Sequence, residues 1–150
     1  MKIRGFEVVS AYRGKGIRLP QRKTARSAGY DIESAEDCTL EPGKIALVPT
    51  GLKAYMQADE YLGIHIRSSL AVKQALTLAN GQGIIDADYY NNESNEGHIL
   101  VALINQGKEI VQITKGARIA QGIFYRYLIA DGDRAGEGEI RTGGFGSTTK

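Results

Sequence analysis

Residues 80–89 read NGQGIIDADY, and the chain is best interpreted outward from this stretch. Gly81 and Gly83 allow the tight backbone turn of a short hairpin. An apolar pair then precedes one carboxylate, Asp86, which is followed by a second acid and by Tyr89. Such a hairpin can offer main-chain N–H and C=O groups to a flat polar ring and hold a carboxylate near a water molecule. Alternatively, it is a buried hairpin in which Asp86 caps a turn. This stretch alone does not separate the two interpretations.

Length and composition predict one globular domain without nucleic-acid or membrane partners, and they leave room for a small anionic ligand. A chain of 150 residues can bury roughly two thirds of its unfolded surface. The net charge of +2 is small and its Lys and Arg residues are scattered, so we expect no nucleic-acid partner. The single Cys38 cannot form an intramolecular disulfide, and no apolar run has the length of a membrane span or signal-peptide core. We therefore expect a cytoplasmic protein with no membrane partner.

Residues 1–130 show the pattern of an all-β domain. Short apolar segments are separated by turn residues, which predicts many short strands in a sandwich or barrel. The segments are IRGFEVV, YDIESA, KIALVPTGL, YLGIHI, HILVALIN, EIVQI and RIAQGIF. Residues 99–104 are apolar on both faces, which predicts a central strand that could lie at a subunit contact. Residues 69–75 (SLAVKQA) alone have helical composition, enough for about two turns.

Residues 131–150 differ from the rest of the chain. They are rich in glycine and have no apolar periodicity, so burial cannot offset the entropy cost of ordering them. We expect a flexible C-terminal arm. A frayed terminus is the alternative, but Phe145 stands alone between Gly144 and Gly146. That placement is typical of a ring that closes over a base.

Five segments together resemble the signature motifs of the trimeric dUTP diphosphatases (dUTPases), in the family's order. They are SAGYDI (27–32), IRSSLA (66–71), GIIDADY (83–89), GARIAQGIF (116–124) and RTGGFGST (141–148). The resemblance covers nearly the whole chain. It implies a jelly-roll-like β fold, a homotrimer, and a site built from three chains. One chain would supply the first, second and fourth motifs, another the third, and the last would close its arm over this neighbouring site.

The resemblance also implies a binding site for the triphosphate. Asp31 would help to hold Mg²⁺ through water, the ion being held mainly by the triphosphate, and Arg118 would be a structural partner of Asp31. The implied phosphate ligands are Arg67, Ser68, Ser69, Gln121, Arg141, Gly146, Ser147 and Thr148. The planar guanidinium of Arg67 suits this role because it meets two oxygens at once. Regular strand alternation predicts that Arg118 and Gln121 lie on opposite faces.

For the nucleoside, the resemblance assigns roles to the third motif and the arm. Asp86 would be the general base that orients and deprotonates the attacking water. Tyr89 would pack against the deoxyribose and leave no room for a 2′-hydroxyl. Asn80 and main-chain groups of Ile84 and Ile85 would read the edge of uracil, because fixed peptide groups cannot flip to suit cytosine. Phe145 would cover the base.

The chain departs from the family pattern in two places. The fifth motif lacks one residue between its Arg and its Phe, so Arg134 competes with Arg141 as the γ-phosphate ligand. After Tyr90 the chain reads NNESNEG (91–97) where most members have a shorter R-G-E turn. We expect a longer surface loop there that leaves the pocket unchanged.

These features predict an Mg²⁺-dependent dUTP diphosphatase. Water would attack the α-phosphorus in line, pyrophosphate would leave, and dUMP would be the product. A dCTP deaminase of the same fold is one alternative, although the Glu that its chemistry needs has no match in IRSSLAVK or GIIDADY. A non-catalytic trimer that binds nucleotide or protein is the other, since a fold does not determine a function.

Overall fold

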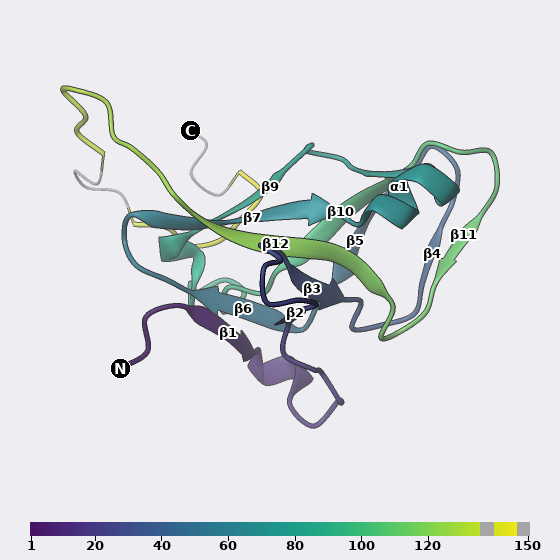
Figure 1. Ribbon diagram of the computed structural model, residues 1–150, viewed down its shortest axis with the longest axis horizontal. Helices are drawn as coiled ribbons and strands as arrows, with labels where there is room; N and C mark the ends of the chain where they lie inside the picture. The colour runs from purple at the N-terminus through teal and green to yellow at the C-terminus, as the bar shows by residue number, and fades with distance from the viewer. Residues whose placement is uncertain (136–139, 147–150) are drawn as a thin grey trace.

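The computed structural model describes residues 1–135 and 140–146, and the fold is almost entirely β (Figure 1). Within these residues the chain forms twelve β-strands, one α-helix and two short 3-10 helices. The predicted all-β class with one short helix is therefore confirmed.

The largest sheet has five strands. In spatial order they are β2 (Gln21–Arg22), β3 (Tyr30–Glu33), β12 (Arg118–Arg126), β7 (Glu60–Ile66) and β9 (Gly83–Asp86). All of its pairings are antiparallel. β7 thus pairs with β12 on one side and with β9 on the other, and β9 is an edge strand.

Three smaller sheets complete the fold. One has the order β5 (Ile45–Pro49), β10 (Leu100–Asn105) and β8 (Leu76–Leu78); the others pair β1 (Gly5–Val8) with β6 (Leu52–Tyr55) and β4 (Cys38–Leu40) with β11 (Val111–Ile113). β10 is a central strand, as the two-sided apolar run predicted. A subunit contact at β10 remains a prediction.

The helix lies where its composition indicated. α1 (Ser68–Gln74) begins and ends one residue before the predicted span, and it stops at Ala75, whose left-handed φ of 55° ends the hydrogen-bonding pattern. The 3-10 helices are η1 (Ser10–Tyr12) and η2 (Ala87–Tyr89). η2 follows β9 directly, so Tyr89 is placed one turn beyond Asp86.

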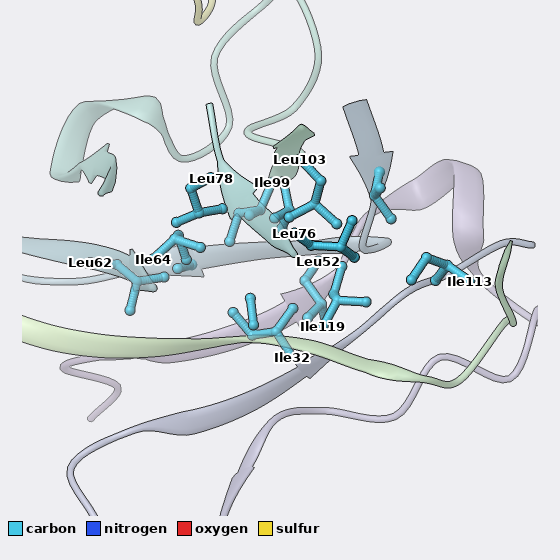
Figure 2. Packing of buried hydrophobic residues seen from close by; sticks show 14 of the residues in the cluster. Ile32, Leu52, Leu62, Ile64, Leu76, Leu78, Ile99, Leu103, Ile113 and Ile119 are labelled. Atoms are coloured by element: carbon cyan, nitrogen blue, oxygen red, sulfur yellow. The ribbon is translucent and has the colours of Figure 1, made fainter. Parts of the chain in front are cut away.

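The core joins the five-stranded sheet to the smaller sheets. Figure 2 shows Ile32, Leu62, Leu76, Leu103 and Ile119 in one cluster of buried side chains. All five side chains are completely buried, and burying a side chain of this size contributes about 1.5–3 kcal/mol. This shared core fixes the position of β7, from which both halves of the candidate site extend.

The predicted segment KIALVPTGL reaches only Leu52, the first residue of β6. The sequence pattern also did not predict β2, β4 or β8. These strands have only two or three residues each, which is too short for an alternating pattern to show. These strands form because they hydrogen-bond to a neighbouring strand, and the conformational preference of their own residues has less influence.

The 91–97 loop is tied to the body of the protein. The Glu96 carboxylate accepts a hydrogen bond from Lys53 Nζ at 2.7 Å and others from the Ser10 N–H at 3.1 Å. Asn92 is 7% exposed. The hydrogen bond from Lys53 is the main cause that lowers the pKa of Glu96 from 4.5 to about 2. The loop is therefore anchored to β6 and η1.

This anchor predicts a pH-dependent stability difference. A lowered pKa means that Glu96 stabilises the fold fully above its ordinary pKa of 4.5 and loses this contribution as the pH falls toward about 2. Glu96→Gln should be less stable than the original chain at neutral pH, and the gap should narrow across that acid range. Urea unfolding at a series of pH values measures it. Glu93→Gln, an exposed change in the same loop, is the control. A gap that does not vary with pH would contradict the assignment.

Candidate active site

The hairpin around β9 presents Asp86 at the start of β7. Asp86 lies opposite Tyr61, and Gly83 lies opposite Ile64. The turn before β9 needs Gly81, whose φ of +73° suits a residue without a Cβ. The Asp86 side chain is 47% exposed. The carboxylate is thus reachable from solvent, as a group that activates a water molecule must be.

A pocket of about 330 Å³ lies between this hairpin, β10 and the arm. Its volume is at the lower end of the range for small-molecule sites. All the residues predicted to bind the nucleobase or the sugar line this pocket: Asn80, Ile84, Ile85, Tyr89 and Phe145. The predicted general base, Asp86, and the arm residue Arg141 line it too. The remaining lining is largely apolar and includes Ile64, Leu78 and Val101. The pocket therefore suits a flat ligand with a polar edge.

The Tyr89 ring is held in a fixed position in the pocket wall. It is 6% exposed, and its hydroxyl donates to the His98 carbonyl at 2.6 Å and accepts from Asn95 Nδ2 at 2.8 Å. Burial raises the pKa of the Tyr89 hydroxyl, while Asn95 and Arg141 act in the opposite direction. A Cβ on Gly144 would lie 2.8 Å from Tyr89 Cε1, so the arm packs directly on the ring.

The 91–97 loop contacts the pocket wall from outside, although none of its residues lines the pocket. The loop turns back after Asn92 and brings the Asn95 amide to the Tyr89 hydroxyl. The Ser94 N–H also donates to the Thr142 carbonyl of the arm at 3.0 Å. Asn95 and His98 carry no sequence signal of this role, because only the fold brings them to the ring.

The described part of the arm lies against the hairpin of its own chain. Arg141 Nη2 is 2.6 Å from Asp86 Oδ2, and its Nε is 2.7 Å from Asp88 Oδ1. Arg134, the competing candidate, is exposed and does not line the pocket. Gly146 is described and exposed. Ser147 and Thr148 lie outside the described residues.

The first and fourth motifs meet on β3 and β12. Gln121 lies opposite Asp31, Arg118 lies opposite Glu33, and a β-bulge at Ile119 shifts the register between them. Residues paired across antiparallel strands share a face, and Glu33 shares the face of Asp31. Arg118 and Gln121 are therefore on the same face, and the prediction of opposite faces is wrong because of the extra residue. Arg118 Nη1 is 3.5 Å from Asp31 Oδ2.

The second motif lies at the far end of β7. Arg67 follows Ile66 and is the N-cap residue of α1, so Ser68 and Ser69 form the first helical turn. The Arg67 N–H donates to the Ile119 carbonyl at 3.2 Å. The second motif is thus held beside the fourth, and the predicted phosphate ligands on β12 and at the start of α1 gather at this end of the sheet.

The two halves of the predicted site are far apart in one chain. Asp86 lies opposite Tyr61 at one end of β7, and Arg67 follows the other end. Arg67 is six residue steps beyond Tyr61, which is roughly 20 Å at about 3.3 Å per step. A triphosphate is much shorter than this, so one chain cannot apply both groups to the same ligand.

The carboxylates of the described residues suit a metal ion that is bound mainly by the phosphates of a bound nucleotide. Among residues 1–135 and 140–146, no three His, Cys, Asp or Glu side chains are placed to hold an ion together. Asp31 instead offers a single, partly exposed carboxylate. This donor set fits Mg²⁺, which commonly keeps water and phosphate oxygens and binds one or two carboxylates. In the described part of the chain, none of the helices has the length and apolarity to cross a membrane.

The fold and pocket define a class of protein: a small β scaffold that binds a flat polar ligand beside an accessible carboxylate. The dUTPase family model matches residues 15–149. This chain therefore belongs to the dUTPase family.

Individual relatives agree with this assignment. The deoxyuridine 5'-triphosphate nucleotidohydrolase of Lactococcus lactis is 57% identical over 148 residues, which is 99% of each chain. The crystal structure of the dUTPase from Streptococcus mutans superposes with a TM-score of 0.81 at 46% identity, covering 85% of this chain and 99% of that one. The dUTPase of phage phi11 of S. aureus has a TM-score of 0.73 at 21% identity, covering 93% and 100%, so it shares the fold alone. The jelly-roll-like fold is confirmed.

The two ion pairs of Arg141 predict what holds the arm in place. Arg141→Gln removes both pairs with Asp86 and Asp88, so the arm should leave the pocket more often. Thermolysin should then cut the arm several times faster than in the original chain, as followed by mass spectrometry. Arg134→Gln, an exposed change in the same arm, should leave the cleavage rate unchanged. Equal acceleration by both variants would show that Arg141 does not hold the arm.

Proposed function

We propose that this chain hydrolyses dUTP to dUMP and pyrophosphate as a homotrimer that requires Mg²⁺. The observation that carries the proposal is that Asp86, Asn80, Tyr89 and Phe145 line one pocket together. It is supported by the 57% identity to a deoxyuridine 5'-triphosphate nucleotidohydrolase over nearly the full length. This activity would supply dUMP for dTTP synthesis and keep uracil out of DNA.

Recognition of uracil follows from the position of β9 at the edge of its sheet. β9 pairs with β7 on one side only, so the outward N–H and C=O groups of an edge strand are free to bind a ligand. Ile84 and Ile85 of this strand line the pocket, next to Asn80. Peptide groups cannot reverse donor and acceptor, and a base with the opposite pattern would leave them unpaired. Cytosine is rejected for this reason.

The sugar and the outer face of the base are recognised by rings. Tyr89 is fixed by two hydrogen bonds to its hydroxyl, so it forms a rigid surface for the deoxyribose and excludes a 2′-hydroxyl. Phe145 lines the pocket and is 64% exposed. It remains free to stack on a base that enters.

Asp86 acts as the general base for the attacking water. It accepts the proton as water attacks the α-phosphorus in line and pyrophosphate leaves. A positioned base contributes about 10²–10⁴-fold, so most of the rate enhancement comes from orientation and charge neutralisation by Arg67, Gln121 and the arm. When bound, Mg²⁺ would neutralise phosphate charge, and the Asp31 carboxylate would help to hold it. When dUTP binds, Arg141 leaves its ion pair with Asp86 and forms one with the γ-phosphate.

The separation along β7 supports assembly of the site between chains. Because roughly 20 Å divides Asp86 from Arg67 within one chain, a neighbouring chain must bring its own Asp86 to this Arg67. We place Asp31, Arg67 and Gln121 of one chain opposite the hairpin of a second. The arm of a third chain covers that hairpin, with the contacts of Arg141 and Thr142 made between chains.

One assay tests the activity and its alternatives. The purified protein should release pyrophosphate from dUTP in the presence of Mg²⁺, and removal of the metal with EDTA should reduce release at least tenfold, since the triphosphate would lose its counter-charge. dCTP should yield neither pyrophosphate nor ammonia. Ammonia from dCTP would indicate a deaminase. No reaction with either nucleotide would leave a non-catalytic binding trimer and refute the proposal.

Replacing the general base tests the mechanism. Asp86→Asn removes the proton acceptor at nearly constant shape, so the variant should fold and bind dUTP while kcat falls by about 10²–10³. Isothermal titration calorimetry and steady-state kinetics measure the two effects. Asp88→Asn is the matched control: its side chain is 66% exposed and does not line the pocket, and it should change kcat only a few-fold. Turnover near that of the original chain in Asp86→Asn would remove Asp86 from the mechanism.

A further inference from the structure

The Tyr89 hydroxyl has two partners of different origin. It donates its proton to the His98 carbonyl at 2.6 Å. Asn95 Nδ2 donates to its oxygen at 2.8 Å. The His98 bond uses main chain that every sequence supplies, whereas the Asn95 bond depends on one side chain of the 91–97 loop. Asn95 is therefore the partner that substitution can test.

The Asn95 amide is oriented by the loop itself. Its Oδ1 accepts from Asn92 Nδ2 at 2.8 Å and from the Gly97 N–H at 3.1 Å, which directs its NH₂ group to Tyr89. Asn92 Nδ2 also donates to the Tyr89 carbonyl at 2.8 Å. The loop thus forms hydrogen bonds with both the main-chain carbonyl and the hydroxyl of Tyr89.

The loop cannot shift easily relative to the hydroxyl. Glu96 is tied to Lys53 and to Ser10. Gly97 lies so close to the end of η2 that a Cβ there would be 2.8 Å from the Tyr89 carbonyl oxygen. The Asn95 NH₂ group, held by this loop, therefore restrains the hydroxyl end of the Tyr89 ring from one side. The hydrogen bond to the His98 carbonyl restrains it from another side and is not enough alone.

We propose that Asn95 is a positioning residue that holds the Tyr89 ring against the sugar and thereby sets the preference for deoxyribose over ribose. This rests on the proposed function, in which Tyr89 excludes the 2′-hydroxyl. Asn95 does not line the pocket and acts through the ring. Without its bond the ring can move away from the sugar, and small displacements of a positioning group have large effects on turnover.

The sharpest test exchanges the donor for an acceptor. Asn95→Asp retains the oxygen that accepts from Asn92 and Gly97 but replaces the NH₂ donor with a second acceptor, so the single proton of the Tyr89 hydroxyl faces two acceptors, this carboxylate and the His98 carbonyl. The ratio of kcat/KM for dUTP to that for UTP should fall about tenfold, as expected when the hydroxyl loses one of its two hydrogen bonds and one acceptor is left unpaired. Glu93→Gln, an exposed change in the same loop, should leave the ratio unchanged.

A double-mutant cycle separates positioning from a merely structural role. Tyr89→Phe removes the hydroxyl, so Asn95→Asp should have no further effect on the dUTP/UTP ratio in that background. Two results would overturn the proposal: an unchanged ratio in Asn95→Asp alone, or effects of the two substitutions that simply add. Equal losses of activity on both nucleotides would also overturn it, since they indicate damage to the fold.

An NMR measurement keeps this proposal distinct from the proposed function. The signal of the hydroxyl-bearing carbon of Tyr89, assigned by its absence in Tyr89→Phe, should shift in Asn95→Asp and not in Glu93→Gln. If the original chain hydrolyses no dUTP but the signal shifts, Asn95 still positions the ring and the proposed function is wrong. An unchanged signal overturns the role of Asn95 whatever the activity.

Discussion

The ladder that joins β7 to β12 on one side and to β9 on the other determines where the acid hairpin and the Arg67 turn lie. β7 carries the acid hairpin opposite its first residues and the Arg67 turn after its last one. A strand cannot be compressed, because each residue advances the chain by about 3.3 Å. The distance between the two groups is therefore a property of the backbone, and side-chain movement cannot close it. A divided site is the direct result.

The elements with a repeating pattern could be predicted from the sequence. The apolar segments that became β3, β5, β7, β10 and β12 were recognised because half-buried strands bury every second residue, or both faces in a central strand. The hairpin was found from its glycines and the carboxylate beside them. The pocket residues on it, from Asn80 to Tyr89, came together as expected, since they are close in the sequence and a short hairpin leaves them little choice.

Features that depend on contacts between distant segments could not be predicted. The bulge at Ile119 appears only when β12 is paired with β3. The bond from Asn95 to Tyr89 requires the 91–97 loop to turn back, and the anchoring of that loop needs Lys53 and Ser10, which are remote in the chain. A free loop and an anchored loop both appear in a sequence as a run of polar residues. The sequence alone therefore predicts a simple surface loop at 91–97.

The bulge in β12 also constrains how this gene can change. Ile119 and Ala120 are successive residues and both are buried, and the bulge between Arg118 and Ala120 accommodates this. Loss of the Ile119 codon would leave Arg118 next to Ala120, opposite Glu33 and on the face of Gln121, but it would remove a completely buried side chain from the core. The extra residue therefore adds an apolar side chain to the core without moving Arg118 from the face it shares with Gln121, and selection should keep a large apolar residue at this position.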